Sequence, residues 1–243
     1  MATPFLSLVI PAHNEERRLP VALQALASFF KDQSYSYEVL VVENGSSDRT
    51  LEVARSYMSA MPYLRVVAEE QRGKGLAVKR GMLEARGEYR FYCDVDFSMP
   101  VTEINRFFPP VLQGADIAIA SREAHGAKRY GEPLYRHLMG RVFNTMVRWM
   151  ALPGLQDTQC GFKCFRAEVV ESIFPRQTLN GWSFDVEVLF IARRWGYRIY
   201  EVPIPWHYNE RSQVRMVQDS WNTARDLLDI RRKTSRGLYD RPI

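Results

Sequence analysis

The sequence predicts one α/β domain, built on a mostly parallel sheet with helices on both faces. Short apolar runs alternate with helical segments at intervals of roughly 20–30 residues, which is typical of parallel β-α-β units. The 243 residues are 46% hydrophobic, which is enough for one sizeable core. No internal repeat and no linker divides the chain. We therefore expect residues 1–243 to form a single domain.

Five buried strands are predicted in the first half of the chain. They span 5–10, 37–42, 64–68, 88–93 and 115–120, and the helices between them span 14–30, 48–61, 73–85 and 102–112. Pro11 is expected to stop the first strand, and Asn14 to cap the first helix. Each polar loop follows the carboxyl end of a strand. Such ends meet at one edge of a parallel sheet, where α/β proteins bind their ligands.

The second half of the chain changes in character. Residues 123–133 are rich in Gly, Pro and charge, which indicates a mobile segment. Helices are predicted at 134–150, 184–195 and 216–232, a turn and short strand within 157–165, and a further strand at 199–202. Pro203 and Pro205 are expected to break the chain after that strand.

The predicted helix 134–150 leaves two interpretations open. Its apolar positions are Leu138, Val142, Phe143, Met146, Val147 and Met150, and its arginines are Arg136, Arg141 and Arg148. A basic amphipathic helix is typical of a membrane surface. The same periodicity is typical of a helix packed against a core, and periodicity alone favours packing. If any part of the chain contacts a membrane, this helix is the candidate.

Composition narrows the possible partners. The net charge of +5 and the pI of about 9.1 favour phosphate-bearing partners or an anionic membrane, and the short basic runs argue against nucleic acid. The three cysteines are too few for a disulfide framework and indicate a reducing cytoplasm, and we expect Cys160 and Cys164 to lie in the core. We expect no signal peptide and find no run of about 18 apolar residues. Membrane association is therefore expected to be peripheral, on the cytoplasmic face.

Asp94-Val95-Asp96 follows the fourth predicted strand and is the main candidate site. Carboxylates at positions i and i+2 of an extended segment point to the same side, and a divalent cation would hold them together. An isolated Asp-x-Asp is more often a solvated turn. Here Glu43 and Lys74 follow other strands and should reach the same edge. Their convergence favours a metal–diphosphate site.

The order of the motifs resembles the family 2 glycosyltransferases, which have the GT-A fold. The matching motifs are Val9-Ile10-Pro11-Ala12-His13-Asn14-Glu15-Glu16, Glu43-Asn44-Gly45-Ser46-Ser47-Asp48, Arg72-Gly73-Lys74-Gly75 and Asp94-Val95-Asp96. Four more are similar to the polyprenyl-phosphate branch, which contains dolichyl-phosphate glucosyltransferases and, more distantly, dolichol-phosphate mannose synthases. These are Ser121-Arg122, Asp157-Thr158-Gln159-Cys160-Gly161-Phe162-Lys163, Trp182-Ser183-Phe184-Asp185-Val186-Glu187 and Glu201-Val202-Pro203-Ile204-Pro205-Trp206. The resemblance covers about residues 5–215 and implies a nucleotide-sugar-binding half (5–122) and an acceptor half (123–243).

The resemblance implies a donor site at the ends of the first strands. Its residues would be Pro11, His13, Asn14, Glu15, Glu43, Asn44, Gly45, Gly73, Lys74 and Asp94. Glu43 would accept hydrogen bonds from the base. The family usually has Asp-Asp-Gly where this chain has Glu43-Asn44-Gly45, so the base stays open between that of UDP and that of GDP. Asp94 and Asp96 would hold Mg²⁺ or Mn²⁺.

The resemblance also implies the reacting groups and the acceptor site. The catalytic residues would be Asp96, Arg122 and Asp157, and the acceptor phosphate would contact Arg136, Arg211 and Arg215. The planar guanidinium group suits phosphate because it binds bidentately.

Four further residues keep more than one interpretation. Asp185 and Glu187 match positions where related sugar transferases have a catalytic base. A phosphate monoester is already anionic near neutral pH and needs little base catalysis, which leaves Asp157 and Asp185 free to orient arginines or sugar hydroxyls. Trp182 and Trp206 either form a wall for the sugar or pack in the core, and core packing is favoured for Trp182.

The favoured functional hypothesis is an inverting transfer of a hexose, with glucose from UDP-glucose as the donor group. The acceptor would be a polyprenyl phosphate, either dolichyl or undecaprenyl, and a metal would assist departure of the nucleoside diphosphate. GDP-mannose is the alternative donor. A transferase acting on a glycan hydroxyl would need a working base, and a non-catalytic module would bind the nucleotide sugar without transfer.

Overall fold

The centre of the fold is a seven-stranded sheet with the order β3-β2-β1-β4-β7-β5-β8, seen in a computed structural model that describes residues 3–209 and 216–241. The strands are β1 (Leu6–Ala12), β2 (Tyr37–Asn44), β3 (Leu64–Glu69), β4 (Tyr89–Cys93), β5 (Ile117–Ser121), β7 (Phe162–Arg166) and β8 (Ile199–Pro203). Neighbouring strands are parallel except β7, which runs antiparallel to both β4 and β5. The predicted α/β class with a mostly parallel sheet is confirmed.

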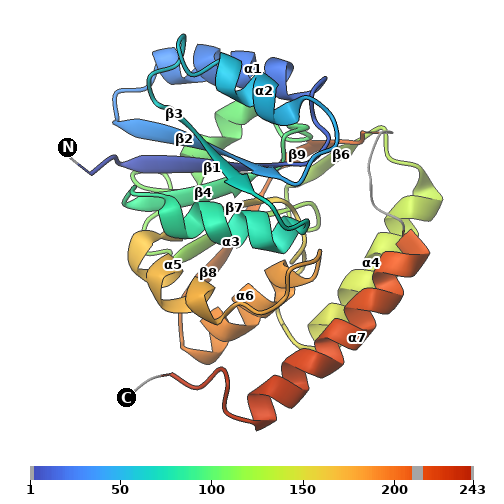
Figure 1. Ribbon diagram of the computed structural model, residues 1–243. Coiled ribbons are helices and arrows are strands. Elements are labelled where there is room, and N and C mark those ends of the chain that lie inside the picture. The colour runs from blue at the N-terminus through green and yellow to red at the C-terminus, as the bar shows by residue number, and fades with distance from the viewer. Residues whose placement is uncertain (1–2, 210–215, 242–243) are drawn as a thin grey trace.

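Helices cover both faces of this sheet (Figure 1). One face carries α1 (Leu19–Lys31), α2 (Thr50–Ser56) and a 3₁₀ helix (Val101–Arg106), and the other carries α3 (Lys74–Glu84), α5 (Ala167–Ile173) and α6 (Phe184–Arg194). Strand β1 is apolar apart from Ser7, because both of its faces are buried. Leu8 and Ile10 enter the core under α1, whereas Val9, between them, enters the core under α3. The predicted core cysteines Cys160 and Cys164 are buried and form no disulfide, and the same holds for Cys93.

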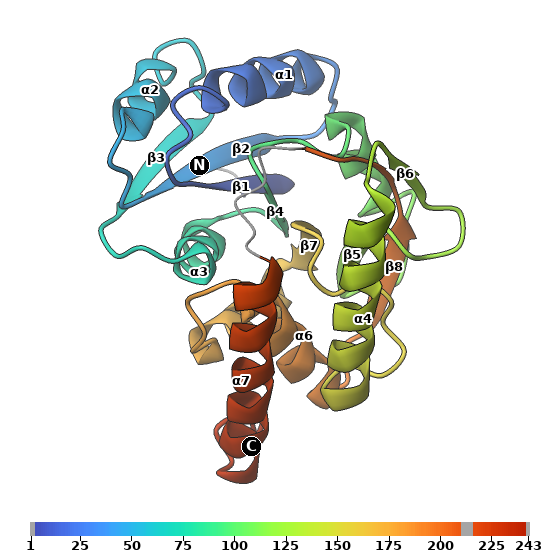
Figure 2. The ribbon, with the colours of Figure 1, turned by 90° about the vertical axis from the view of Figure 1, so that its right-hand side faces the viewer.

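Two long helices stand beside the sheet layers. α4 (Leu134–Met150) and α7 (Met216–Ser235) lie next to each other (Figures 1 and 2), and Arg231 Nε donates to the Met150 carbonyl at 3.1 Å. A two-stranded ribbon of β6 (Lys128–Tyr130) and β9 (Pro205–His207) joins the chain before α4 to the chain after β8. Within the described ranges, no helix is both long and apolar enough to span a bilayer.

The loop between β1 and α1 differs from its prediction. Pro11 does not stop β1, which continues to Ala12. Strand β4 pairs with β1 only over Leu6–Val9, so Pro11 lies beyond that ladder, where its missing N–H costs no bond to β4. Asn14 does not cap α1, which begins five residues later. Its φ is +56°, and its side-chain oxygen accepts a bond from the Ser47 N–H at 2.9 Å.

Other boundaries changed where proline or strand pairing overrode the local pattern. The helix predicted at 102–112 is only the 3₁₀ helix 101–106, because Pro109-Pro110 cannot continue it. Strands β6 and β9 lie in segments predicted to be mobile or broken by proline. The predicted helix 48–61 is the shorter α2, and α5 was not predicted.

Helix α4 is only half covered. Val147 and Asn144 are buried, but Leu138, Val142 and Trp149 are 64%, 66% and 90% exposed. The prediction that Leu138 and Val142 pack against the core is therefore wrong. The exposed positions recur at intervals of four and seven residues, so they form one stripe along the helix. We call this stripe, which also includes Leu134, the exposed face of α4.

Candidate active site

Two adjoining pockets lie where the carboxyl ends of β1, β2 and β4 meet. The sheet-edge pocket has a volume of about 490 Å³, and the helix-side pocket, which reaches α4, has about 240 Å³. The predicted residues that line the sheet-edge pocket are Pro11, His13, Glu15, Asn44, Gly73, Lys74, Asp94 and Asp96. The predicted residues that line the helix-side pocket are Lys74, Asp94, Asp96, Arg122 and Arg136. Lys74, Asp94, Asp96 and Trp182 line both, so they mark the junction.

The acidic pair is held at this junction. Lys74 Nζ lies 2.6 Å from Asp94 Oδ1, and the Ser98 N–H donates to Asp96 Oδ1 at 3.1 Å. A Cβ atom on Gly161 would fall 2.1 Å from Asp94 Oδ2, so only glycine leaves room for that carboxylate. Burial, together with the neighbouring Asp94 carboxylate, raises the pKa of Asp96. Two like charges are thus kept close together.

This pair fits a divalent cation that shares its coordination with a substrate. Mg²⁺ is commonly bound by one or two carboxylates, with water and phosphate oxygens as the other ligands. Among the described residues, no group of three or more His, Cys, Asp and Glu side chains is arranged to hold a metal. A cation between Asp94 and Asp96 would offset the repulsion that raises the pKa of Asp96.

The loop that carries Lys74 is anchored from two sides. The Asn44 side chain accepts a bond from the Gly73 N–H at 2.9 Å and donates to the Gln71 carbonyl. Gly75 N donates to the Asn180 carbonyl at 2.9 Å. A Cβ at Gly73 or Gly75 would meet backbone oxygens of segment 179–181 at 2.6–2.7 Å, so these glycines permit contact between two loops. Burial alone would lower the pKa of Lys74, but Asp94 and Asp185 outweigh it and raise that pKa.

A chain of hydrogen bonds fixes the histidine of the sheet-edge pocket. His13 Nδ1 lies 2.7 Å from the Asn44 carbonyl oxygen, which can only accept, so Nδ1 carries the proton. Asn14 Nδ2 faces His13 Nε2 at 3.3 Å. Asn14, Glu43 and Gly45 do not line either pocket, and Glu43 Oε1 instead accepts a bond from the Ser46 N–H at 2.5 Å.

Arg122 is fixed by a buried carboxylate. Asp157 is fully buried, and its two oxygens accept bonds from Arg122 Nε at 2.6 Å and Nη2 at 2.9 Å. Burial alone would raise the pKa of Asp157, but the Arg122 guanidinium outweighs it and lowers that pKa. Arg122 also lies 5.5 Å from the centre of the Trp206 ring. Arg122 lines the helix-side pocket and Asp157 does not, which makes Asp157 a support for the arginine.

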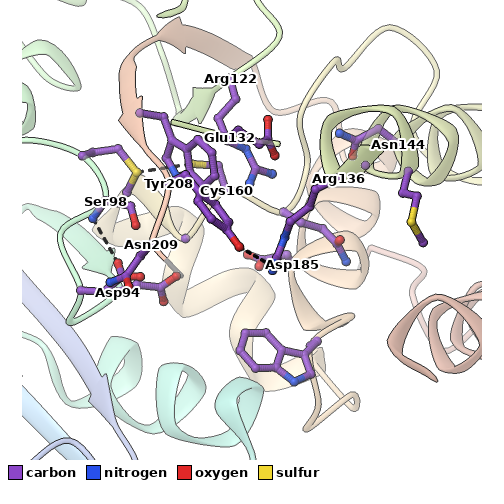
Figure 3. Close-up of a pocket in the computed structure, with 18 of the residues that line it drawn as sticks. Asp94, Ser98, Arg122, Glu132, Arg136, Asn144, Cys160, Asp185, Tyr208 and Asn209 are labelled. Carbon is purple, nitrogen blue, oxygen red and sulfur yellow. Dashed lines mark hydrogen bonds between the residues drawn. The ribbon is translucent and has the colours of Figure 1, made fainter. Parts of the chain in front are cut away.

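Arg136 reaches the same pocket from α4. Figure 3 shows Asp94 and Ser98 on one side of the pocket, with Arg136 and Asn144 on the other. Arg136 Nη1 donates to the Tyr208 hydroxyl at 2.9 Å. Arg211 and Arg215, the other predicted acceptor residues, lie outside the described residues.

The surroundings of Glu187 and Trp182 decide between the two interpretations that the sequence left open for each. Glu187 is fully buried, accepts bonds from the Thr178 N–H at 2.9 Å and the Tyr239 hydroxyl at 2.5 Å, and lines neither pocket. It therefore supports the loop before α6. Trp182 is 40% exposed, and Lys74 Nζ lies 4.7 Å from its ring centre, so core packing is wrong for Trp182.

Some pocket residues had no counterpart in the prediction. These are Arg18, Glu132, Met139, Asn144, Tyr208 and Asn209, whereas Arg72 belongs to a matching motif but was given no role. Arg18 Nε donates to Glu15 Oε2 at 2.5 Å, and burial raises the pKa of Glu15 despite this arginine. The spacing of three residues between Glu15 and Arg18 was the one feature of the sequence that could have predicted this pair. The α4 residues carry no local signal, because only the tertiary position of the helix brings them to the pocket.

An acidic pair lies between a nucleotide-sized pocket and a second pocket that contains arginines, at the carboxyl edge of this sheet. This arrangement defines a glycosyltransferase with the GT-A fold. Comparison with known proteins agrees. The family described as "Glycosyl transferase family 2" matches residues 7–174. The chain belongs to this family, as its motifs predicted.

Individual relatives extend the similarity over nearly the whole chain. Dolichyl-phosphate beta-glucosyltransferase of Dictyostelium discoideum is 32% identical, and the alignment covers 97% of this chain and 76% of the relative. The Homo sapiens enzyme of the same name is also 32% identical, with 98% and 78% covered. Among solved structures, glucosyl-3-phosphoglycerate synthase of Mycobacterium tuberculosis, in complex with Mn²⁺, UDP and glucosyl-3-phosphoglycerate, superposes with a TM-score of 0.67 at 20% identity. That match covers 93% of this chain and 80% of the other, and it shows the shared fold.

Proposed function

We propose that this glycosyltransferase transfers glucose from UDP-glucose to a polyprenyl phosphate such as dolichyl phosphate, with inversion at the anomeric carbon. The names of the relatives in Dictyostelium discoideum and Homo sapiens support the sugar and the acceptor class. The observation that carries the proposal is the state of the carboxylates in the helix-side pocket. Glu132 is paired with Arg129, Asp185 with Lys163 and Asp94 with Lys74, which leaves no unpaired carboxylate to act as a base beside the acidic pair among the described lining residues.

A phosphate acceptor does not need such a base. Its oxygen is already anionic near neutral pH and can attack the anomeric carbon without losing a proton first, whereas a glycan hydroxyl would have to be deprotonated. Arg122 and Arg136 supply two guanidinium groups to the same pocket, which suits a phosphate group. In this proposal Asp157 keeps Arg122 directed at the phosphate.

The donor would occupy the sheet-edge pocket with its diphosphate at the junction. His13, Glu15 and Asn44 would line the nucleotide, and Lys74 would contact the diphosphate. Asp94 and Asp96 would hold Mg²⁺ or Mn²⁺, which would stabilise the charge of the departing nucleoside diphosphate. The phosphate of the acceptor would then approach from the helix-side pocket, on the opposite side of the sugar.

A transfer assay with a donor panel tests this function. Incubation with radiolabelled UDP-glucose, Mg²⁺ and dolichyl or undecaprenyl phosphate should yield an organic-soluble glucolipid, with GDP-mannose giving much less. If GDP-mannose is the better donor, the base and the sugar are both misassigned. If product forms only with a free glycan, the acceptor class is wrong.

We also propose that the exposed face of α4 contacts a membrane on its cytoplasmic side. Leu134, Leu138, Val142 and Trp149 present a continuous apolar stripe. Arg141, also exposed, is next to Val142 in the helix, and such an arrangement of apolar and basic residues is typical of interfacial helices. The opposite face of α4 lines the helix-side pocket. A lipid-borne phosphate would thus find its pocket next to the membrane surface.

Vesicle flotation tests this contact. The pair Leu138→Asp and Val142→Asp should weaken binding to vesicles of phosphatidylcholine and phosphatidylserine by at least about tenfold, because two apolar side chains would no longer enter the interface. The matched control is Val21→Asp with Val111→Asp, which changes residues 67% and 65% exposed elsewhere on the surface. Equal binding of both double variants would refute the role of α4.

A further inference from the structure

A buried lysine lies beneath the helix-side pocket. Lys163 is completely buried, and its Nζ is 2.9 Å from Asp185 Oδ1 and 2.5 Å from the Cys160 carbonyl oxygen. The hydroxyl of Tyr92, also fully buried, donates to the same Asp185 oxygen. Lys163 does not line either pocket, whereas Asp185 does.

The antiparallel strand β7 creates this arrangement. In its register with β4, Lys163 stands directly opposite Tyr92, so both side chains leave the same face of the sheet. That face is covered by α6, whose first turn carries Asp185. Burial of a charged pair is costly unless its partners are well placed, and removal of one partner is strongly destabilising. A lysine at this position therefore calls for an explanation beyond packing.

The second oxygen of Asp185 is available to a ligand. Within the described parts of the chain, Asp185 Oδ1 accepts both bonds and Oδ2 has no hydrogen-bond partner. The residue is 4% exposed, and that small exposure is to the helix-side pocket. Asp185 lines this pocket together with Lys74 and Asp94, which places it near the junction of the two pockets. Trp182, three residues earlier, lines both pockets there.

We propose that Asp185 Oδ2 accepts a hydrogen bond from a hydroxyl group of the transferred hexose, and that Lys163 and Tyr92 hold the carboxylate in place for this contact. Asp185 is then a specificity-determining residue and Lys163 a positioning residue. The inference rests on the proposed function, because it requires a nucleotide-hexose donor at the junction.

The chemistry of the carboxylate selects this ligand group. An ionised carboxylate only accepts hydrogen bonds, so it attracts a hydroxyl and repels the phosphate oxygens of donor and acceptor. With two donors already on Oδ1, its negative charge is partly neutralised. Asp185 is therefore better suited to orient a sugar hydroxyl than to remove a proton.

Equilibrium binding of UDP and UDP-glucose with Mg²⁺ separates the sugar contact from the nucleotide contact. Asp185→Asn should weaken UDP-glucose binding by about tenfold, as expected for loss of a hydrogen bond to a charged group, and leave UDP binding unchanged. Lys163→Met should produce the same selective loss of UDP-glucose affinity, although Lys163 does not line the pocket. Lys163→Arg should retain part of that affinity. A merely structural lysine would weaken UDP and UDP-glucose equally, or neither.

Deoxy-sugar donors and a double variant separate loss of the sugar contact from loss of folding. The wild type should lose affinity for one of the 2-, 3-, 4- or 6-deoxyglucose donors, and Asp185→Asn should no longer distinguish that analogue from UDP-glucose. The double variant Lys163→Met with Asp185→Leu replaces the buried pair by apolar side chains, a change that proteins often tolerate, and should show the same sugar-specific loss.

The outcomes distinguish this inference from the proposed function. If UDP binds and Asp185→Asn leaves UDP-glucose affinity and deoxy-sugar discrimination intact, the contact is refuted and the proposed function stands. Parallel titrations with GDP and GDP-mannose apply the same comparison to the other donor. If the wild type binds none of these nucleotides, both the function and the contact fail.

Discussion

Asp96→Asn is expected to reduce transfer by at least about a thousandfold while leaving the fold intact, because metal-assisted charge stabilisation is worth several kcal/mol. The side chain is partly exposed, and it accepts a hydrogen bond from the Ser98 N–H, which an amide oxygen can also accept. Removing the charge also removes repulsion from Asp94, whose presence contributes to the raised pKa of Asp96. The free energy of unfolding should therefore stay equal or rise slightly.

Transfer rate and urea unfolding, measured on the same preparation, check this expectation. The matched control is Asp32→Asn, the same change at an exposed carboxylate after α1, which should affect neither quantity. A variant at Asp96 that keeps a tenth of the wild-type rate would show that the acidic pair is not the metal site.

Asp157→Asn should destabilise the protein by about 3 kcal/mol and slow transfer by about a hundredfold. Breaking a buried ion pair commonly costs about 3–5 kcal/mol, and the lower end applies because Arg122 still reaches a pocket. The slower transfer follows from a displaced Arg122, since small misplacements of a positioning group cost about that factor. The control is Asp116→Asn, which breaks the bidentate pair with Arg198, whose side chain is 59% exposed, and should have a much smaller effect.

The contribution of Asp157 to the free energy of unfolding should decrease as the pH falls. Its folded-state pKa is lowered by Arg122 below the unfolded value of about 3.9, so its ionisation stabilises the fold above that value. As the pH falls through the lowered pKa, this stabilisation is lost. Urea unfolding should therefore show the gap between wild type and Asp157→Asn closing below about pH 4. A gap that is constant from pH 7 to pH 3 would mean that the charge of Asp157 does not hold Arg122.

Local signals carried much of the prediction. The buried strands were found because short apolar runs end in polar turns, and the position of Asp94 after β4 follows from the same pattern. The Gly73–Gly75 segment was correctly placed at the start of α3, since glycine and the helical spacing behind it are both local features. Some boundaries failed where the predicted residue has a distant partner, as at Asn14, whose side chain accepts a bond from the Ser47 N–H while α1 begins only at Leu19.

The packing of α4 was decided by neighbours that no local pattern reveals. Its amphipathic sequence is compatible with a core or a membrane, and the structure leaves Leu138 and Val142 exposed while Val147 is buried. The reason is that α4 contacts α7 and the helix-side pocket with one face only. Periodicity measures how apolar residues are distributed around a helix, and it does not say which face meets protein.

By itself, the sequence determined the family, the strands of the first half of the chain and the acidic pair that follows the fourth of them, because these depend on residues close together in the chain. The tertiary structure decided which charged groups are available to a ligand. Strand β7 enters the sheet antiparallel between β4 and β5 and brings Lys163 against Asp185, while Asp157 reaches Arg122 from 35 positions away. Burial and pairing of this kind set whether a carboxylate acts as a base, a support or a ligand contact, and they exist only once the chain has folded.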